Sequence, residues 1–250
     1  AGLLIADGGL GGNLEIAEHR ARVTINNGVA VTRVTQVFHN TEDRVVEALY
    51  TFPVPRGASV ANFSMWINGK EMVGEVVEKE RARQIYNSYK PQKRDPGLLE
   101  QADFRSFEMR IFPVPANGDQ RVEIAYYQEL EVDDDALRYV YPLATSTRPE
   151  ADSRTTGAFS INVEVKSAVP VAAVGSPSHG EAFVIARHAA DYVQASLESR
   201  GGRLDRDVVI DLRLARPRTG LDLITSKDGR GDGYFLLTLT AGEDLGRLDA

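Results

Sequence analysis

Apolar and polar residues alternate along most of the chain, a pattern typical of β-strands that bury one face. In the second half, Phe159, Ile161, Val163 and Val165 alternate with polar residues, as in a sheet with one solvated side. The same reading predicts strands at 14–16, 23–25, 29–38, 45–52, 121–130, 159–165, 192–197, 208–214 and 234–240. The chain is therefore predicted to be mainly β.

Short turn signals separate these strands. Asn27-Gly28 and Asn68-Gly69 are each typical of a two-residue hairpin turn. The tetrapeptide FPVP occurs at 52–55 and again at 112–115. Proline cannot donate a hydrogen bond to a neighbouring strand, so both copies are expected at strand ends or sheet edges. Residues 1–13 contain two glycine pairs and no apolar period, which indicates a flexible entry to the first strand.

One stretch, 71–90, has a helical period instead. Ala82, Ile85, Tyr86 and Tyr89 fall on one face of a helix, and Pro91 follows as a stop. A lone amphipathic helix in a β protein needs a sheet to cover its apolar side. We therefore expect Ile85, Tyr86 and Tyr89 to pack on the first sheet.

Three adjacent carboxylates, Asp133 to Asp135, suggest a solvated turn between two domains. The predicted architecture is two β-sandwich-like domains, residues 1–132 and 133–250, the first with one amphipathic helix packed on its sheet. The chain starts at Ala1 without a methionine and ends in polar residues after a strong strand, so we expect a processed piece of a longer protein.

Composition removes several classes of function. The 250 residues carry a net charge of −7 with scattered basic residues, which argues against nucleic-acid binding. No apolar run approaches the roughly 20 residues that a membrane helix needs. The absence of cysteine excludes disulfides and thiolate metal sites.

Candidate chemistry is sparse. His19, His39, His179 and His188 have no metal-ligand spacing and are interpreted as isolated surface or turn residues. No GxSxG motif is present, and the Ser-His stretch at 175–179 suits a turn better than a nucleophile elbow. The DGRGDG run at 228–233 resembles a calcium loop and contains Arg-Gly-Asp, but it lacks the distal glutamate and favours a turn.

These patterns predict no catalytic residue, no cofactor and no metal site, and they leave the binding residues open. Trp66 is the best candidate for an exposed anchor if it lies on the solvent side of its hairpin. Tryptophan side chains are more often buried in the core than exposed as anchors, so a core position is the more common alternative for Trp66.

An ordered set of short motifs resembles the vault protein inter-alpha-trypsin (VIT) domain over about residues 29–130. The set comprises Asn40-Thr41, the first FPVP, the hairpin at 63–70, GEVVEKE at 74–80, Ala82 with Ile85-Tyr86, DPGLLE at 95–100, and the strands at 107–113 and 122–126. The resemblance implies a domain without catalytic residues that commonly precedes a von Willebrand factor A domain. The Asp-x-Ser-x-Ser metal motif of that second domain is absent, so we expect it after Ala250.

The function expected from this resemblance is a non-catalytic interaction or scaffold region of an exported protein. Its partners would be proteins or neighbouring domains of the same chain, in a secreted, periplasmic or cell-envelope location. Two alternatives stay open at this point. One is a carbohydrate-active β-sandwich enzyme that uses two surface carboxylates, and the other is a pure structural spacer.

Overall fold

The computed structural model describes residues 2–55, 57–67, 69–74, 104–133, 135–143, 155–201, 204, 206–215, 220–227 and 232–240. These residues form a mainly β fold with one short helical turn, α1 (Ala6–Gly9), and one 3-10 turn, η2 (Gly180–Ala182). The predicted fold class, mainly β and sandwich-like, is confirmed. Four sheets contain the described strands.

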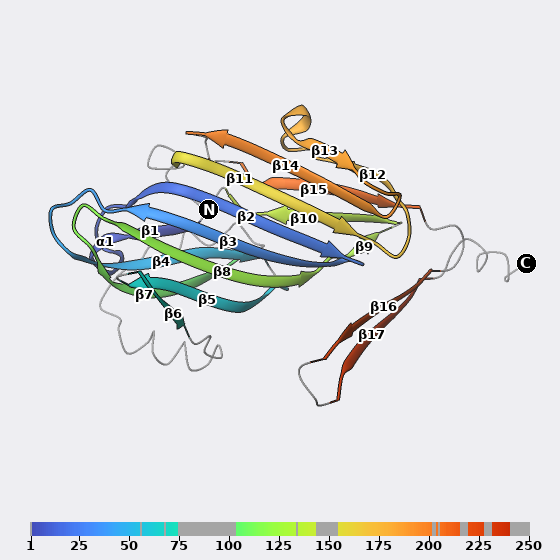
Figure 1. Cartoon of the computed structure of the whole chain (residues 1–250), viewed down its shortest axis with the longest axis horizontal. Helices are drawn as coiled ribbons and strands as arrows, with labels where there is room; N and C mark the ends of the chain where they lie inside the picture. The colour runs from blue at the N-terminus through green and yellow to red at the C-terminus, as the bar shows by residue number, and fades with distance from the viewer. Residues whose placement is uncertain are drawn as a thin grey trace, which may run out of the picture.

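The largest sheet has eight strands and forms one layer of the molecule (Figure 1). In spatial order they are β13 (Val184–Arg187), β14 (Tyr192–Arg200), β11 (Thr155–Lys166), β2 (Glu15–Asn26), β3 (Val29–His39), β8 (Asp119–Glu129), β5 (Ser59–Ile67) and β6 (Lys70–Gly74). Neighbouring strands are antiparallel except β11 and β2, which run parallel.

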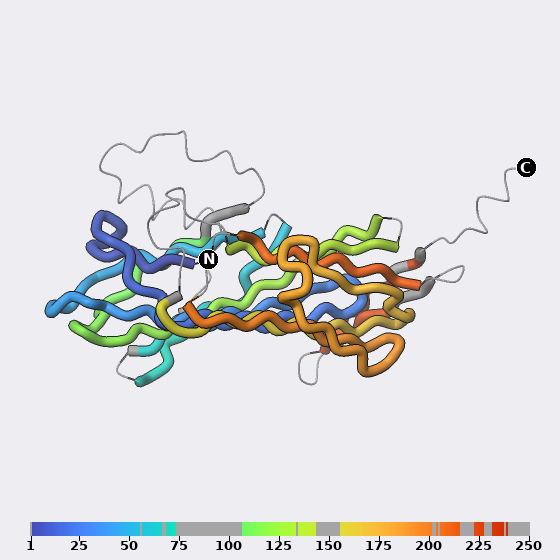
Figure 2. The backbone as a smooth tube through the Cα atoms, turned by 90° about the horizontal axis from the view of Figure 1, so that it is seen from above, coloured from blue at the N-terminus to red at the C-terminus, as the bar shows by residue number. Residues whose placement is uncertain are grey.

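Two smaller sheets lie side by side against the inner face of the large one, so that the body has two layers when seen edge-on (Figure 2). The first contains β1 (Leu3–Ile5), β4 (Val46–Pro55) and β7 (Phe104–Val114). The second contains β12 (Val171–Gly175), β15 (Val208–Leu214), β10 (Ala136–Tyr141) and β9 (Val132–Asp133). A single cluster of buried apolar residues runs between the layers.

The fourth sheet is a hairpin of β16 (Gly220–Ser226) and β17 (Tyr234–Thr240). Figure 1 shows it projecting from the two-layered body. Its two strands hydrogen-bond to each other, and within the described ranges no other strand joins them.

The alternation of side chains explains why these segments form sheets. Along β3, every second residue is buried: Ala30, Thr32, Val34, Gln36 and Phe38. The residues that alternate with them face outward. The predicted turn at Asn27-Gly28 is confirmed, because both residues have positive φ, of 46° and 83°, and β2 and β3 pair on either side of them. The strands expected at 208–214 and 234–240 are found with those bounds.

The predicted boundary near Asp133 falls in the turn of a hairpin. Asp133 of β9 pairs with Ala136 of β10, and both strands belong to the four-stranded sheet. Moreover, β11 from the second half extends the sheet that β2 and β3 from the first half begin. The two sandwich-like units therefore share one eight-stranded sheet and one core.

Two local predictions are wrong. The amino-terminal stretch is not a flexible entry, because β1 pairs with β4 and both Leu4 and Ala6 are buried. The segment read as a helix does not begin at Glu71, since Lys70–Gly74 is the edge strand β6, paired with β5. The remainder of that predicted helix, including Ile85, Tyr86 and Tyr89, lies outside the described residues.

The two FPVP copies end strands, as predicted. The strand β4 stops at Pro55, and β7 stops at Val114, one residue before Pro115. In the second copy the peptide bond between Phe112 and Pro113 is cis.

Candidate docking surface

One small hollow among the described residues lies beside the β2–β3 turn. It has a volume of about 10 Å³ and is lined by Gly28, Leu137 and Leu212 among others. A cavity of that size holds about one water molecule. Within the same residues, no group of three or more His, Asp or Glu side chains is arranged to hold a metal ion. No helix there is long and apolar enough to cross a membrane.

The Ser-His stretch at 175–179 is a turn, as predicted. The Ser176 hydroxyl donates to the carbonyl of Val209 at 2.8 Å, and the Ser178 hydroxyl accepts from the Val209 amide at 2.8 Å. The same Ser178 oxygen lies 2.8 Å from Nδ1 of His179. Both hydroxyls are therefore used to fasten this turn to β15, which gives the cluster a structural role.

His19 contradicts the interpretation of the histidines as surface or turn residues. It lies in the middle of β2 and is completely buried. Its Nε2 is 2.6 Å from the hydroxyl of Tyr141 on β10, and its Nδ1 is 3.2 Å from Nε2 of Gln36 on β3. Burial lowers the pKa of His19 to about 3, so the ring is neutral at physiological pH.

The partners of Gln36 decide which nitrogen of His19 carries the proton. Gln36 Nε2 donates to the carbonyl of Gly2 at 2.9 Å, and its Oε1 accepts from the Tyr50 hydroxyl on β4 at 2.8 Å. The amide nitrogen can only donate, so Nδ1 of His19 accepts, and Nε2 donates to Tyr141. The network joins all three sheets of the body and is sealed from solvent, which makes it a structural link and not a reaction centre.

Trp66, the anchor suggested by the sequence, lies on the outer side of β5 and is half-buried. The guanidinium carbon of Arg121 stands 4.4 Å from the centre of the indole ring. Such a cation–π contact covers one face of the ring. Trp66 is therefore neither a core residue nor a freely exposed anchor.

Six exposed large apolar side chains lie together on the β16–β17 hairpin. Directly opposite residues share a face, and Leu223 pairs with Leu237 while Thr225 pairs with Phe235. Leu239 lies on this same face because it follows Leu237 by two positions. We call Leu223, Phe235, Leu237 and Leu239 the hairpin face; their side chains are 55%, 73%, 51% and 69% exposed.

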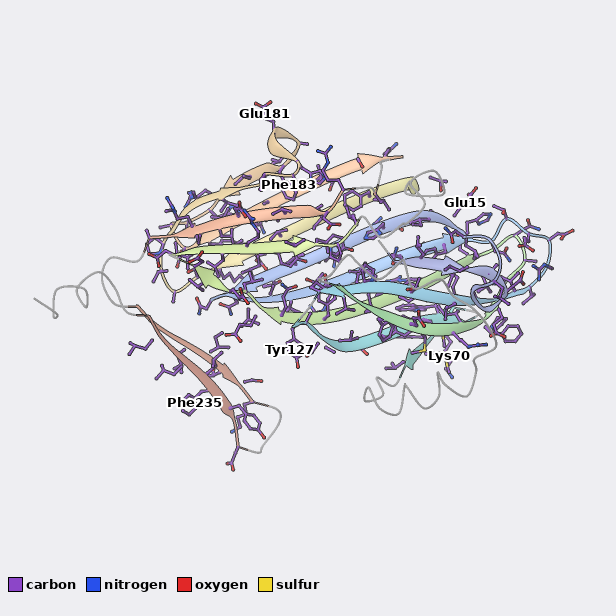
Figure 3. The ribbon with its side chains drawn as sticks, turned by 180° about the vertical axis from the view of Figure 1, so that it is seen from behind. Glu15, Lys70, Tyr127, Glu181, Phe183 and Phe235 are labelled. Carbon is purple, nitrogen blue, oxygen red and sulfur yellow. The ribbon has the colours of Figure 1, made fainter. Side chains whose placement is uncertain are left out.

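The opposite side of the hairpin is also rich in apolar side chains. Leu236 pairs with Ile224, and Tyr234 pairs with Ser226. Near-continuous apolar runs are typical of strands buried on both faces. A two-stranded hairpin is marginally stable by itself in water. Figure 3 shows Phe235 on the hairpin, away from the body of sheets.

Covering the hairpin face would be strongly favourable. Full burial of a leucine or phenylalanine side chain contributes about 1.5–3 kcal/mol. Because the four side chains are on average about three-fifths exposed, their complete burial would contribute roughly 4 to 7 kcal/mol. Taken as a free energy of association, this range corresponds to dissociation constants from about 1 mM to about 10 μM.

Comparison with known proteins finds a family match in the first half of the chain. The model of the Vault protein inter-alpha-trypsin domain matches residues 16–126, from β2 to β8. Residues 16–126 are similar to a VIT domain. The resemblance expected from the sequence is therefore confirmed, and the match covers β2, β3, β4, β5, β6, β7 and most of β8.

Relatives of this VIT domain are parts of longer proteins. The von Willebrand factor A domain-containing protein 5A of Rattus norvegicus is 27% identical over 177 residues, which is 70% of this chain and 21% of that protein. The inter-alpha-trypsin inhibitor heavy chain H6 of Homo sapiens is 31% identical over 117 residues, or 47% of this chain and 9% of that protein. The chain thus spans about a fifth or less of the length of these relatives.

A solved structure shares the fold beyond the VIT domain. A putative nutrient binding protein from Legionella pneumophila superposes with a TM-score of 0.54 over 85% of this chain and 70% of its own, at 14% identity. The covered share is larger than residues 16–126, so the shared fold extends beyond the segment that matches the VIT model.

Proposed function

We propose that this chain is a non-catalytic docking scaffold, in which the hairpin face packs against a von Willebrand factor A domain that follows it. The observation that carries the proposal is the exposed cluster of Leu223, Phe235, Leu237 and Leu239. Apolar surface of this extent is typical of an interaction site, because water contact with it is unfavourable.

The identity of the occupant is supported by the relatives. One relative, in Rattus norvegicus, matches 177 residues and bears the von Willebrand factor A domain in its name. The hairpin is the last described element of the chain, so a domain placed after it would be tethered within reach of the hairpin face. Tethering raises the effective concentration of such a domain, often to the millimolar range.

A non-catalytic role is supported by what the titratable groups do. The strongly shifted histidine, His19, is sealed in the core. The carboxylates with lowered pKa values, Glu164 and Asp211, owe the shift to hydrogen bonds from Tyr192 and Arg138 respectively. These groups serve structural contacts. An exported location, in the secreted, periplasmic or envelope space, belongs to the same proposal and is supported by the inter-alpha-trypsin inhibitor relative.

The test compares variants of the full-length protein by small-angle X-ray scattering. Replacing Phe235 and Leu237 together by serine removes about half of the hairpin face. We expect the wild type to be compact and the double variant to have a larger radius of gyration, because the docked domain is released. The Leu10→Ser variant is the matched control, since Leu10 is 92% exposed in the turn after α1 and lies outside the hairpin face.

A pure spacer would give a different result. If the scattering curves of the wild type and the Phe235→Ser, Leu237→Ser variant coincide, the hairpin face does not hold the next domain. Loss of compactness in the Leu10→Ser variant would also contradict the proposal, because that leucine is not part of the docking surface.

A further inference from the structure

The outer face of the eight-stranded sheet is turned toward the viewer in Figure 1. Two arginines lie directly opposite each other on this face. Arg22 on β2 pairs with Arg33 on β3, and both side chains are exposed. Residues directly opposite on one face have Cβ atoms about 4.5–5.5 Å apart, so the two guanidinium groups can reach the same ligand. The residues paired with them on the next strands are uncharged: Asn162 of β11 pairs with Arg22, and Ala125 of β8 pairs with Arg33. These paired residues form one row across the sheet.

Three carboxylates of the same face already have other partners. Glu18 pairs with Arg20, Glu123 pairs with Arg121 and accepts from Thr35, and Glu164 accepts from Tyr192 and pairs with Lys166. Within the described residues, neither Arg22 nor Arg33 makes an ion pair. Like charges directly opposite each other destabilise a sheet. The Arg22–Arg33 pair therefore lowers the stability of the sheet. No carboxylate of the described residues forms an ion pair with either arginine.

Exposed apolar side chains lie beside the arginines. In the next row toward the β2–β3 turn, Val31 of β3 pairs with Tyr127 of β8, and the two are 36% and 49% exposed. Residues two apart in a strand lie about 7 Å apart on the same face. Tyr127 is labelled in Figure 3. Arginine and tyrosine are among the residue types that contribute most to binding at protein interfaces.

We propose that Arg22, Arg33, Val31 and Tyr127, the arginine patch, form a docking surface for an acidic polypeptide segment. A guanidinium group binds a carboxylate through two parallel hydrogen bonds, and two adjacent groups fit a pair of Asp or Glu side chains. The Val31–Tyr127 pair fits an apolar side chain next to those carboxylates. This apolar neighbour favours a peptide over a sulfated glycan, which has no such side chain to place there.

The arginine patch is independent of the hairpin face. It lies on β2, β3 and β8 of the large sheet, whereas the hairpin face lies on β16 and β17. The two proposals can therefore fail separately.

The experiment titrates the 250-residue chain into a fluorescein-labelled peptide in which Asp-Glu pairs alternate with leucine, and follows fluorescence anisotropy. We expect saturable binding that weakens with added salt, because exposed charges are screened. The Arg22→Gln, Arg33→Gln variant should bind about tenfold more weakly or worse. The Arg138→Gln, Arg213→Gln variant is the matched control, because it removes the same charge from two exposed positions of the four-stranded sheet, and it should bind like the wild type.

A third variant, Arg33→Glu, separates binding from folding. It replaces the like-charged pair with an opposite-charged one, so its urea midpoint should not fall, while peptide binding should be lost. The proposal is overturned if the wild type does not bind the peptide, or if both double variants bind it equally well. It is also overturned if heparin binds in an Arg22- and Arg33-dependent way while the peptide does not, since the surface would then be a glycan site.

Discussion

The buried histidine makes the stability of this protein depend on pH in a defined window. Folded His19 has a pKa of about 3, whereas a histidine in the unfolded chain titrates near its ordinary value of 6.5. Below pH 6.5 the unfolded state therefore binds one proton more than the folded state. The corresponding stability is fully present above pH 6.5 and is lost as the pH falls toward 3.

The magnitude follows from the difference in pKa. Each pH unit within the window costs about 1.4 kcal/mol of folding free energy for one such group. Between pH 7 and pH 5 the loss attributable to His19 is therefore about 2 kcal/mol. Most carboxylates titrate below this interval, so the histidine contribution can be read there with little interference.

The assay is urea unfolding at pH 7 and pH 5, followed by circular dichroism. The His19→Gln variant keeps an amide that can hydrogen-bond to Tyr141, but it cannot titrate. We expect the wild type to lose about 2 kcal/mol between the two pH values and the variant to lose less than about 0.5 kcal/mol. His188→Gln, which removes an exposed histidine, is the control and should keep the wild-type difference.

Two results would refute the reasoning about His19. Equal losses in the wild type and in His19→Gln would mean that the ring is not the group that opposes protonation in the folded state. A wild-type free energy of unfolding that does not change between pH 7 and pH 5 would mean that the ring is accessible to protons without unfolding.

Three further predictions concern packing and metal binding. A Cβ on Gly157 of β11 would overlap the backbone carbonyl of Ala17, so Gly157→Ala should lower the free energy of unfolding by about 1–3 kcal/mol in urea. Gly175→Ala is the control: its Cβ would meet open space, so the free energy of unfolding should change by less than about 0.5 kcal/mol. A Cβ on Gly2 would overlap Gln36 and lie 2.8 Å from Phe52, so Gly2→Ala should lower the melting temperature, whereas Gly12→Ala, whose Cβ would have nothing within 4 Å, should not. Equal melting temperatures of the two variants would contradict the placement of the amino-terminal strand in the core. Calorimetric titration should detect no micromolar binding of calcium or magnesium, and binding of either ion would point first to the loop at 228–233.

The strands were predictable where one face is buried and the other is solvated. The alternation around Phe159 to Val165, and the Asn27-Gly28 turn, each depend on local side-chain chemistry that the sequence displays. The pairing of strands was not predictable in the same way. Nothing in the local pattern shows that β11 lies parallel to β2, more than a hundred residues away in the chain, and this pairing is what unites the two halves in one sheet.

Short strands and edge strands were missed for a related reason. The strand β13 has no buried residue, so its sequence has no apolar alternation to detect. The three residues of β1 are held by pairing with β4 and by burial of Leu4, which are long-range effects. The helical period of the segment that begins at Glu71 predicts a helix there, whereas pairing with β5 makes residues 70–74 a strand.

The two surfaces differ in how much of them the sequence could reveal. The run from Tyr234 to Leu239 was recognised as a strong strand, but only the structure shows that its side chains are left uncovered. His19 gave no signal because a polar residue on the buried side of a strand looks like an error in the pattern until its partners on β3 and β10 are known. Arg22 and Arg33 become neighbours only through the register of the hairpin.

Hydrogen–deuterium exchange tests the docking scaffold most directly. The amides of β16 and β17 would be compared between the 250-residue chain and the full-length protein, with β3 in the core as the internal reference. If a following domain covers the hairpin face, exchange at Leu223, Phe235 and Leu237 should slow by at least about tenfold in the full-length protein while β3 is unchanged. Identical exchange of the hairpin in the two proteins would contradict the central claim that this surface holds the next domain.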